Sequence, residues 1–306
     1  MISPRFSRRF TDRSTFLEDG GFSPGDLNLS AWYKLDVLAR TAWNEANKQA
    51  NDSTGNGNNG TIGSGVVLSF DASNNDRLDL GSQVSEFNDT TQAYSFSFWF
   101  NPQLLSGAKL IFSQQDGAGN NSGIRCYTNN DKFRFGIRDD GSNNIDVENN
   151  LALSINTWYH VAITYDGGGS ASGISIAIDE TNTAVTTIAD LGTLPSTLTV
   201  SANFQINGRD GTNLLTDFEI GNFQCWNVEL SSAQITELYN NPTGLQIPTG
   251  LVSGNLLAHW LMAEAEGNDD PIIWDYSTNL RTAQFSTTAA SPYSPMIVTG
   301  KQITRN

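Results

Sequence analysis

Hydrophobic and polar positions alternate along several stretches in the middle of the chain. The clearest is the segment 94–100, Tyr-Ser-Phe-Ser-Phe-Trp-Phe, in which every second residue is aromatic. Successive side chains of a β-strand point to opposite faces, so this pattern predicts a strand with one aromatic face. Apolar residues also alternate over 157–165 and 173–179, and a run of three glycines separates these two segments. Strands with one apolar face need a second sheet to cover them, which predicts two stacked antiparallel sheets.

One short helix is predicted over 230–239. Ser231 and Gln234 are spaced as a capping box, and Leu230 and Ile235 as a hydrophobic staple. Elsewhere helical periodicity is scarce, and short apolar runs alternate with Thr, Ser, Asn and Gly, which is typical of an all-β sandwich. We expect the helix to close one edge of that sandwich.

The charge and the cysteine count limit the classes of partner. Lys and Arg number 17 against 32 Asp and Glu, which gives a formal net charge of −15. Such a surface repels phosphate backbones, so we expect no nucleic-acid binding by the globular body. Cys126 and Cys225 are too few for a disulfide framework, and we expect two thiols in a reducing compartment. Whether these two residues pair is left open.

Targeting signals are not apparent in the sequence. The opening residues contain no apolar segment typical of a secretory signal, and no stretch approaches the roughly 18 apolar residues of a membrane span. The sequence therefore predicts a protein without membrane insertion that folds where it is made. An outside destination would require another route of release, such as cell lysis.

Residues 1–29 differ from the rest of the chain, because arginine and phenylalanine are interleaved there. We interpret this segment as a basic arm that anchors the protein to a partner or to other copies in a homo-oligomer. The alternative is an arm that folds back onto its own acidic body. The residues assigned to anchoring are Arg5, Phe6, Arg8, Arg9, Phe10 and Arg13.

The end of the chain repeats its opening pattern. The segments 256–264 and 275–279 resemble 31–35 and 52–56, and too few residues follow for a second full domain. We therefore divide the chain into an arm (1–29), a main domain (30–245) and a C-terminal extension (246–306). Because an unpaired strand edge favours aggregation, the extension must add strands to its own sandwich or pack on a neighbouring copy.

Several motifs occur in the order found in one known family. They are Trp-Tyr-Lys-Leu-Asp at 32–36, the aromatic segment 94–100, Asn-Thr-Trp-Tyr-His-Val-Ala-Ile-Thr-Tyr-Asp at 156–166, and Phe-Glu-Ile-Gly-Asn-Phe-Gln-Cys-Trp-Asn at 218–227. Together they resemble a laminin-G-like domain of the concanavalin A-like group. The resemblance implies a two-sheet jelly roll with a helix after its last strand. Asp179 and Glu180 lie where that family turns a hairpin with Asp-Gly.

Catalysis is not expected. Some members of the fold group are glucanases, which carry Glu-x-Asp-x-Glu on one strand, and the chain lacks that motif. Asp179 and Glu180 are adjacent and so point to opposite faces of a strand. The two histidines, His160 and His259, lie beside tryptophans in apolar segments, where a packed, hydrogen-bonded histidine is expected. We therefore interpret the protein as a non-enzyme, with a glycoside hydrolase as the least favoured reading.

Calcium and sugar are the two ligands that the resemblance suggests. Laminin-G-like domains often hold Ca²⁺, and a hard cation needs six to eight oxygen ligands. The candidate ligands are Asp52, Asn56, Asn58 and Asn222, although Asn-rich turns also use these oxygens to cap backbone N–H groups. An exposed aromatic ring could stack on a sugar, and the candidate glycan contacts are Trp43, Tyr127 and Trp274.

The half-repeat and the run Trp-Asn-x-x-Leu-Ser at 226–231 are similar to laminin-G-like virion proteins of tailed bacteriophages. This resemblance implies a structural virion protein, such as a capsid-decoration, neck or tail-appendage protein, released by lysis. Its arm would bind other virion proteins, and its lectin-like domain would face outward and adhere to cell-surface glycans. The alternative is a stand-alone carbohydrate-binding module.

Overall fold

A computed structural model describes most of the chain between residues 66 and 285. The described ranges are 43–44, 49–50, 60–61, 66–72, 77–117, 121–139, 143–209, 216–241, 247–260, 262, 272–273, 275–281, 283–285 and 296–299. The chain divides into two compact units, Met1–Gly63 and Ser64–Asn306. In the first unit, the described residues form a small antiparallel sheet of β1 (Trp43–Asn44), β2 (Gln49–Ala50) and β3 (Gly60–Thr61).

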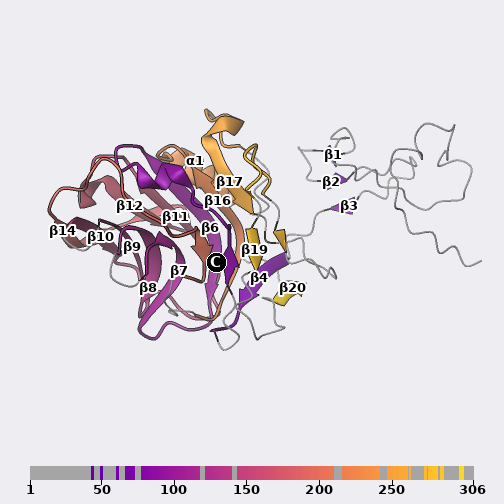
Figure 1. Ribbon diagram of the computed structural model, residues 1–306. Helices are drawn as coiled ribbons and strands as arrows, with labels where there is room; N and C mark the ends of the chain where they lie inside the picture. Colours follow the sequence, from indigo (N-terminus) through magenta and orange to yellow (C-terminus); the bar gives the residue numbers. More distant parts are fainter. Residues whose placement is uncertain are drawn as a thin grey trace, which may run out of the picture. The chain divides into compact units, whose positions relative to one another are not determined.

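The second unit is a sandwich of two antiparallel sheets (Figure 1). The nine-stranded sheet has the order β14-β10-β9-β8-β7-β15-β5-β19-β18 among the described residues. Its strands are β14 (Val185–Leu191), β10 (Asn143–Asn149), β9 (Lys132–Asp139), β8 (Gly123–Asn129), β7 (Ala108–Gln115), β15 (Gln205–Ile206), β5 (Leu78–Asp79), β19 (Ala283–Phe285) and β18 (Ile272–Ile273).

The eight-stranded sheet has the order β13-β12-β11-β6-β16-β4-β20, and β17 also pairs with β16. Its strands are β13 (Thr181–Thr183), β12 (Ile174–Ile178), β11 (Tyr159–Tyr165), β6 (Tyr94–Pro102), β16 (Phe218–Trp226), β4 (Val66–Phe70), β20 (Met296–Thr299) and β17 (Leu256–Trp260). The three central strands predicted from alternation are therefore confirmed as β6, β11 and β12.

The core lies between the sheets and is mostly aromatic. The alternating aromatic residues of β6 are all buried in one cluster, as the sequence predicts. Phe96 of β6 contacts Phe112 of β7 and Phe135 of β9, with ring centroids 4.6 and 5.9 Å apart. Phe98 stacks on Phe223 of β16 at 5.2 Å. These rings close the space between the sheets without disulfides, and Cys126 and Cys225 are buried free thiols.

Helix α1 (Ser232–Asn240) begins with the predicted capping box between Ser231 and Gln234. The structure places it on the outer face of the eight-stranded sheet rather than at an edge. Ile235 and Leu238 pack with Trp226 and with Ala162 and Ala177 of the sheet. Ala162 of β11 and Ala177 of β12 lie on that outer face, and the helix covers them and keeps them from water. Three short 3₁₀ helices, Ser85–Asn88, Ala171–Gly173 and Ser253–Asn255, complete the described helical segments.

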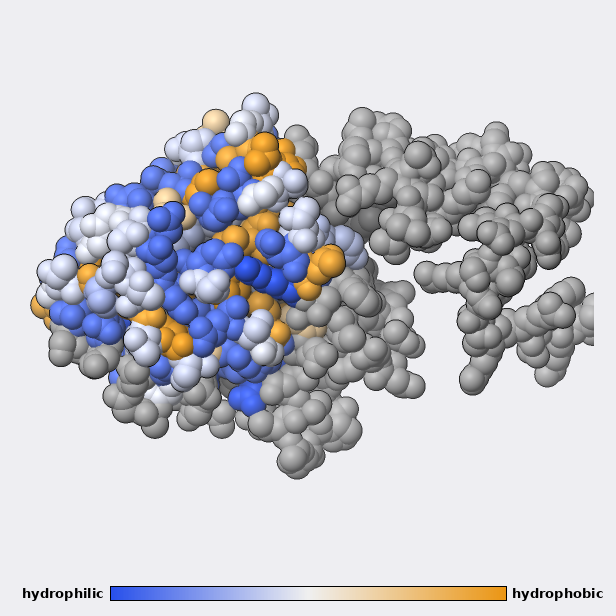
Figure 2. Space-filling model, turned by 45° about the horizontal axis from the view of Figure 1, so that its top comes forward, coloured by the Kyte–Doolittle hydropathy of each residue, from blue (hydrophilic) through white to orange (hydrophobic). Residues whose placement is uncertain are grey.

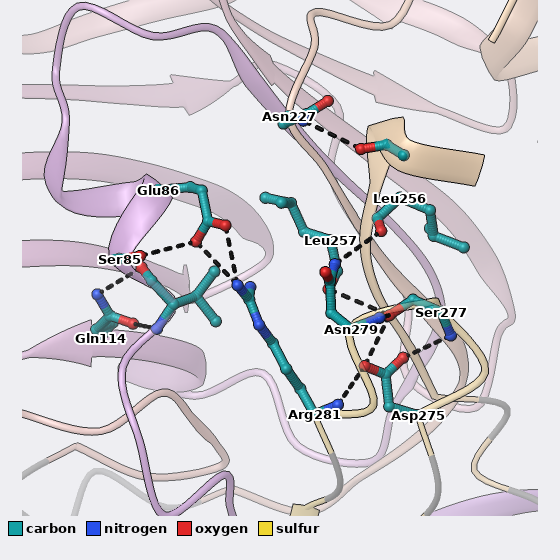
Figure 3. A network of polar contacts seen from close by, with 12 residues as sticks. Ser85, Glu86, Gln114, Asn227, Leu256, Leu257, Asp275, Ser277, Asn279 and Arg281 are labelled. Carbon is teal, nitrogen blue, oxygen red and sulfur yellow. Dashed lines mark hydrogen bonds and ion pairs between the residues drawn. The ribbon is translucent and has the colours of Figure 1, made fainter. Parts of the chain in front are cut away.

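Strands from the C-terminal segment join both sheets of the same chain. β17 pairs with β16, β19 pairs with β5, and β20 pairs with β4. Figure 3 shows the polar contacts that fix the segment around 275–281: Arg281 reaches Glu86 at 2.9 Å. The Asp275 carboxylate accepts hydrogen bonds from the backbone N–H groups of His259, Ser277 and Arg281, and from the Ser277 hydroxyl.

Candidate functional site

The outer face of the nine-stranded sheet carries charged side chains on three neighbouring strands. On β8, Ile124 and Cys126 point into the core, so Arg125 and Tyr127 point outward. The same alternation holds on β9 and β10, where Phe133, Phe135, Ile137, Ile145 and Val147 are the core residues. We call the outward positions of these strands the arginine face. They are Arg125, Tyr127, Asn129, Lys132, Arg134, Gly136, Arg138, Asn144, Asp146 and Glu148.

Strand register places Arg125, Gly136 and Asp146 in one row across the sheet. The Arg125 guanidinium forms an ion pair with Asp146 at 3.0 Å, and the Tyr127 hydroxyl donates to the same carboxylate oxygen at 3.0 Å. Arg125 also lies over the Tyr127 ring, 4.7 Å from its centroid. Gly136 has no side chain, and a Cβ there would lie only 3.2 Å from the Asp146 carboxylate. The glycine therefore leaves room for Asp146 of β10 to reach across β9 to Arg125 of β8.

A second row is centred on Glu148. Arg134 donates to this carboxylate at 2.5 Å, and Lys132 lies 3.8 Å from it. Burial alone would raise the pKa of Glu148, but hydrogen bonds from Arg134 and Asn129, with the charges of Arg134 and Lys132, outweigh burial and lower the pKa. Glu148 is therefore an ionised acceptor at neutral pH.

Arg138 lies at the end of β9, between Gly123 on β8 and Asn144 on β10. No carboxylate of the described residues lies within ion-pair distance of its guanidinium. Burial and the nearby charge of Arg125 lower the pKa of Arg138, and they outweigh the charges of Asp146 and Tyr127, which raise it. Gly123 leaves the neighbouring position without a side chain, and a Cβ there would collide with the Gln114 carbonyl oxygen at 1.9 Å.

Several hydrogen-bond acceptors without a partner among the described residues lie on residues that neighbour these arginines across the strands. The Oδ1 atoms of Asn144 and Asp146 and the Oε1 atom of Gln115 are buried and have no hydrogen-bond partner among the described residues. Asn144 is 7% exposed, Asp146 5% and Gln115 0%. A buried acceptor without a donor is costly, and such atoms are concentrated at sites that take a ligand or ordered water. The face therefore combines cationic donors with buried acceptors whose donors are not among the described residues.

Of the three predicted glycan contacts, Tyr127 is the one whose side chain lies among the described residues. Its ring lies under Arg125 and its hydroxyl is bonded to Asp146, so it supports the charged groups of the face. Burial raises the pKa of Tyr127, so its hydroxyl remains a donor at neutral pH. Trp274 and the side chain of Trp43 lie outside the described residues. Direct contact of these three rings with a glycan remains a prediction.

The predicted calcium ligands are not brought together in the described part of the chain. Asp52, Asn56 and Asn58 lie outside the described residues. Asn222 is in β16, where its side-chain oxygen accepts from the Gln224 amide at 2.9 Å and is 2.8 Å from His259 Nε2. Among the residues that the structure describes, no three His, Cys, Asp or Glu side chains form a metal-binding group. Calcium binding remains a prediction.

Both histidines are packed and hydrogen-bonded, as predicted. His160 Nε2 lies 2.9 Å from the Ser97 hydroxyl, and both residues are buried. Burial lowers the pKa of His160 and of His259 to about 3. Each histidine is therefore neutral at ordinary pH. His160 packs within β11 and His259 within β17.

The arm residues Arg5, Phe6, Arg8, Arg9, Phe10 and Arg13 lie outside the described residues. No described helix is long and apolar enough to cross a membrane.

Figure 2 shows one face of the molecule, on which hydrophobic residues form small separate patches among hydrophilic ones.

Sequence reasoning missed most of the arginine face. The signal in the sequence is the run Asn-Ile-Asp-Val-Glu at 144–148, whose polar residues alternate with two core residues. It lacks the first Glu of the glucanase motif but places Asp146 and Glu148 on one face of a strand. Arg125 and Arg138 join them only through strand pairing across β8, β9 and β10.

Comparisons with known proteins agree with this architecture. Residues 73–236 match the laminin-G-type family described as the concanavalin A-like lectin/glucanases superfamily. No curated protein sequence matches the chain.

Solved structures give distant resemblances. A putative carbohydrate binding protein from Bacteroides ovatus is 16% identical over 83% of this chain and 67% of its own, with a TM-score of 0.49. The botulinum neurotoxin serotype G binding domain is 19% identical over 49% of this chain, with a TM-score of 0.38. This chain spans only 36% of that domain. The family match covers more than half of the chain, and the chain belongs to the concanavalin A-like lectin/glucanases superfamily.

Proposed function

We propose that the protein is a carbohydrate-binding module that holds a saccharide on the arginine face. The observation that carries this proposal is the set of buried acceptors, unpaired among the described residues, beside Arg125 and Arg138 on the outer face of the nine-stranded sheet. Sugars offer many hydroxyl donors and acceptors, which suit such a surface. Membership of a superfamily named for its lectins and glucanases supports the same ligand class.

We also propose that binding occurs without hydrolysis. A glycosidase needs one carboxylic acid with a raised pKa and a second, ionised carboxylate across the scissile bond. On the arginine face, Asp146 is paired with Arg125, and the pKa of Glu148 is lowered by its own basic neighbours. Glu148 therefore lacks the environment of a general acid, and the Asp146 carboxylate is held in an ion pair. A reducing-sugar assay with each bound glycan is expected to show no product, and release of product would contradict this proposal.

A glycan array followed by calorimetry on the full chain tests the binding proposal. Asp146→Asn is expected to weaken binding about tenfold or more, because the charged acceptor and its hold on Arg125 are lost. Glu229→Gln is the matched control, since it changes an exposed carboxylate beside helix α1, on the opposite side of the sandwich. Thermal melting of both variants separates loss of the site from loss of the fold. An array without any binding, or unchanged binding by Asp146→Asn, would refute the proposal.

The same array with and without EDTA tests calcium. Loss of binding in EDTA that added Ca²⁺ restores would support calcium binding, for which the predicted ligands are Asp52, Asn56, Asn58 and Asn222.

Attachment to a bacteriophage particle is the more specific role suggested by the sequence, and it depends on residues 1–29. Deletion of this arm is expected to leave a folded sandwich that no longer joins particles. Particle incorporation of the truncated protein would contradict the anchoring role.

A further inference from the structure

The arginine face has a charge opposite to that of the whole protein. Its outward positions on β8, β9 and β10 carry four cations, Arg125, Lys132, Arg134 and Arg138, against two carboxylates, Asp146 and Glu148. The chain as a whole has a formal net charge of −15. An acidic protein repels anions, so a local excess of positive charge marks a sheet face where an anion can approach favourably.

The excess charge is divided between the two ends of that face, one positive charge at Lys132 and Arg134 and one at Arg138. Arg125 is paired with Asp146, while Arg134 and Lys132 share Glu148. Arg138 has no ion-pair partner among the described residues, and its cross-strand neighbours are Gly123, which has no side chain, and the neutral Asn144. A guanidinium offers two parallel N–H donors, which match the geometry of a carboxylate or a sulfate.

We propose that Arg138 binds the acidic group of an anionic saccharide, carboxylated or sulfated, whose hydroxyl groups donate to the Oδ1 atoms of Asn144 and Asp146. This inference rests on the proposed function and names the class of sugar. The acidic group supplies the ion-pair partner that the described residues do not offer to the Arg138 guanidinium. The hydroxyl groups supply the donors that the two acceptors lack. A neutral saccharide would supply only the hydrogen-bond donors and not the ion-pair partner for Arg138.

Matched sugars test the inference by calorimetry on the full chain. The probes are a galacturonic acid trisaccharide, its methyl ester, and a sulfated trisaccharide of the same length. We expect the acid or the sulfated sugar to bind about tenfold or more tightly than the neutral ester, since a charged hydrogen-bonded pair is lost in the ester. The preference should shrink as salt is added. Comparing the affinity of the acid with that of the sulfated sugar shows which anionic group Arg138 binds more tightly.

Arg138→Gln should abolish the preference, so that the acid, the sulfated sugar and the ester bind this variant with similar affinity. Lys109→Gln is the charge-matched control: Lys109 pairs with Thr128, at the opposite end of β8 from Gly123, so this variant should keep the preference. Arg138→Lys retains the charge without the paired donors and should keep part of the preference. It provides the measurement if Arg138→Gln does not fold, as judged by circular dichroism.

The outcomes separate this inference from the proposed function. Equal binding of acid, ester and sulfated sugar, weakened by Asp146→Asn, would overturn the anionic specificity and leave carbohydrate binding intact. A preference that survives in Arg138→Gln would overturn the role of Arg138. A glycan array without any binding would overturn both proposals.

Discussion

Glu180 holds a backbone conformation that is unfavourable for a residue with a side chain. It forms the turn between β12 and β13 with Asp179, and their φ angles are 62° and 49°. Glycine adopts positive φ without steric cost, whereas other residues lose roughly 1 kcal/mol there. Glu180→Gly is therefore expected to raise the free energy of unfolding by about 0.5–1 kcal/mol. The midpoint of urea denaturation measures the change.

The control for this prediction is Asp131→Gly in the turn between β8 and β9. Asn130 has a φ of 56°, but Asp131 is not among the residues with positive φ. Glycine at 131 therefore adds only backbone freedom to the unfolded chain and should lower stability. Equal effects at the two positions would show that the turn conformation at Glu180 is not the cause.

The buried histidines make stability depend on pH. Their pKa is about 3 in the folded protein, against 6.5 in an exposed state. Above pH 6.5 they are neutral in both states. Below it the unfolded chain binds protons that the folded chain does not, so stability falls as pH falls towards 3. Between pH 7 and pH 5 the loss should be about 2 kcal/mol for each histidine.

His160→Gln tests this pH dependence. The substitution removes one titrating group and should roughly halve the fall in unfolding free energy between pH 7 and pH 5, whatever its effect at pH 7. Urea denaturation at several pH values gives the slope. An unchanged slope would mean that His160 takes up its proton in the folded state.

At the scale of elements, the segment 275–281 is held mainly by one buried carboxylate. Asp275 accepts from three backbone N–H groups and one hydroxyl, whereas the Arg281–Glu86 pair is partly exposed. Asp275→Ala leaves these donors without a partner and should cost about 2–4 kcal/mol. Arg281→Gln should cost less than about 1 kcal/mol, as is usual for exposed ion pairs. Chemical denaturation of both variants gives the comparison, and the reverse order would contradict it.

The sequence predicts the elements whose side-chain pattern is complete within a single segment. Alternation identifies β6, β11 and β12, and the Ser231–Gln234 capping box identifies helix α1. It does not show that α1 lies on a sheet face, because the apolar outer positions Ala162 and Ala177 look like ordinary strand residues. The arginine face also escapes prediction, since Arg125 and Asp146 are 21 residues apart and meet only through the register of three strands.

At the scale of the whole molecule, the sandwich depends on strands beyond the matched family segment, which ends at residue 236. Trp260 of β17 is fully buried and packs on Phe204 and Phe223. A chain that ends at residue 255 would expose these rings and one edge of β16. We expect such a truncation to aggregate, which size-exclusion chromatography measures. A soluble, monomeric product would show that β17 is dispensable.

Helix α1 has a practical consequence, because it covers the side of the sandwich opposite the arginine face. Both native thiols are buried, and burial raises the pKa of each well above the ordinary range, so neither reacts readily. A cysteine introduced at the exposed position Ala233 would thus be a selective handle for attachment to a bead or sensor chip. Every immobilised copy would then present the arginine face away from the point of attachment.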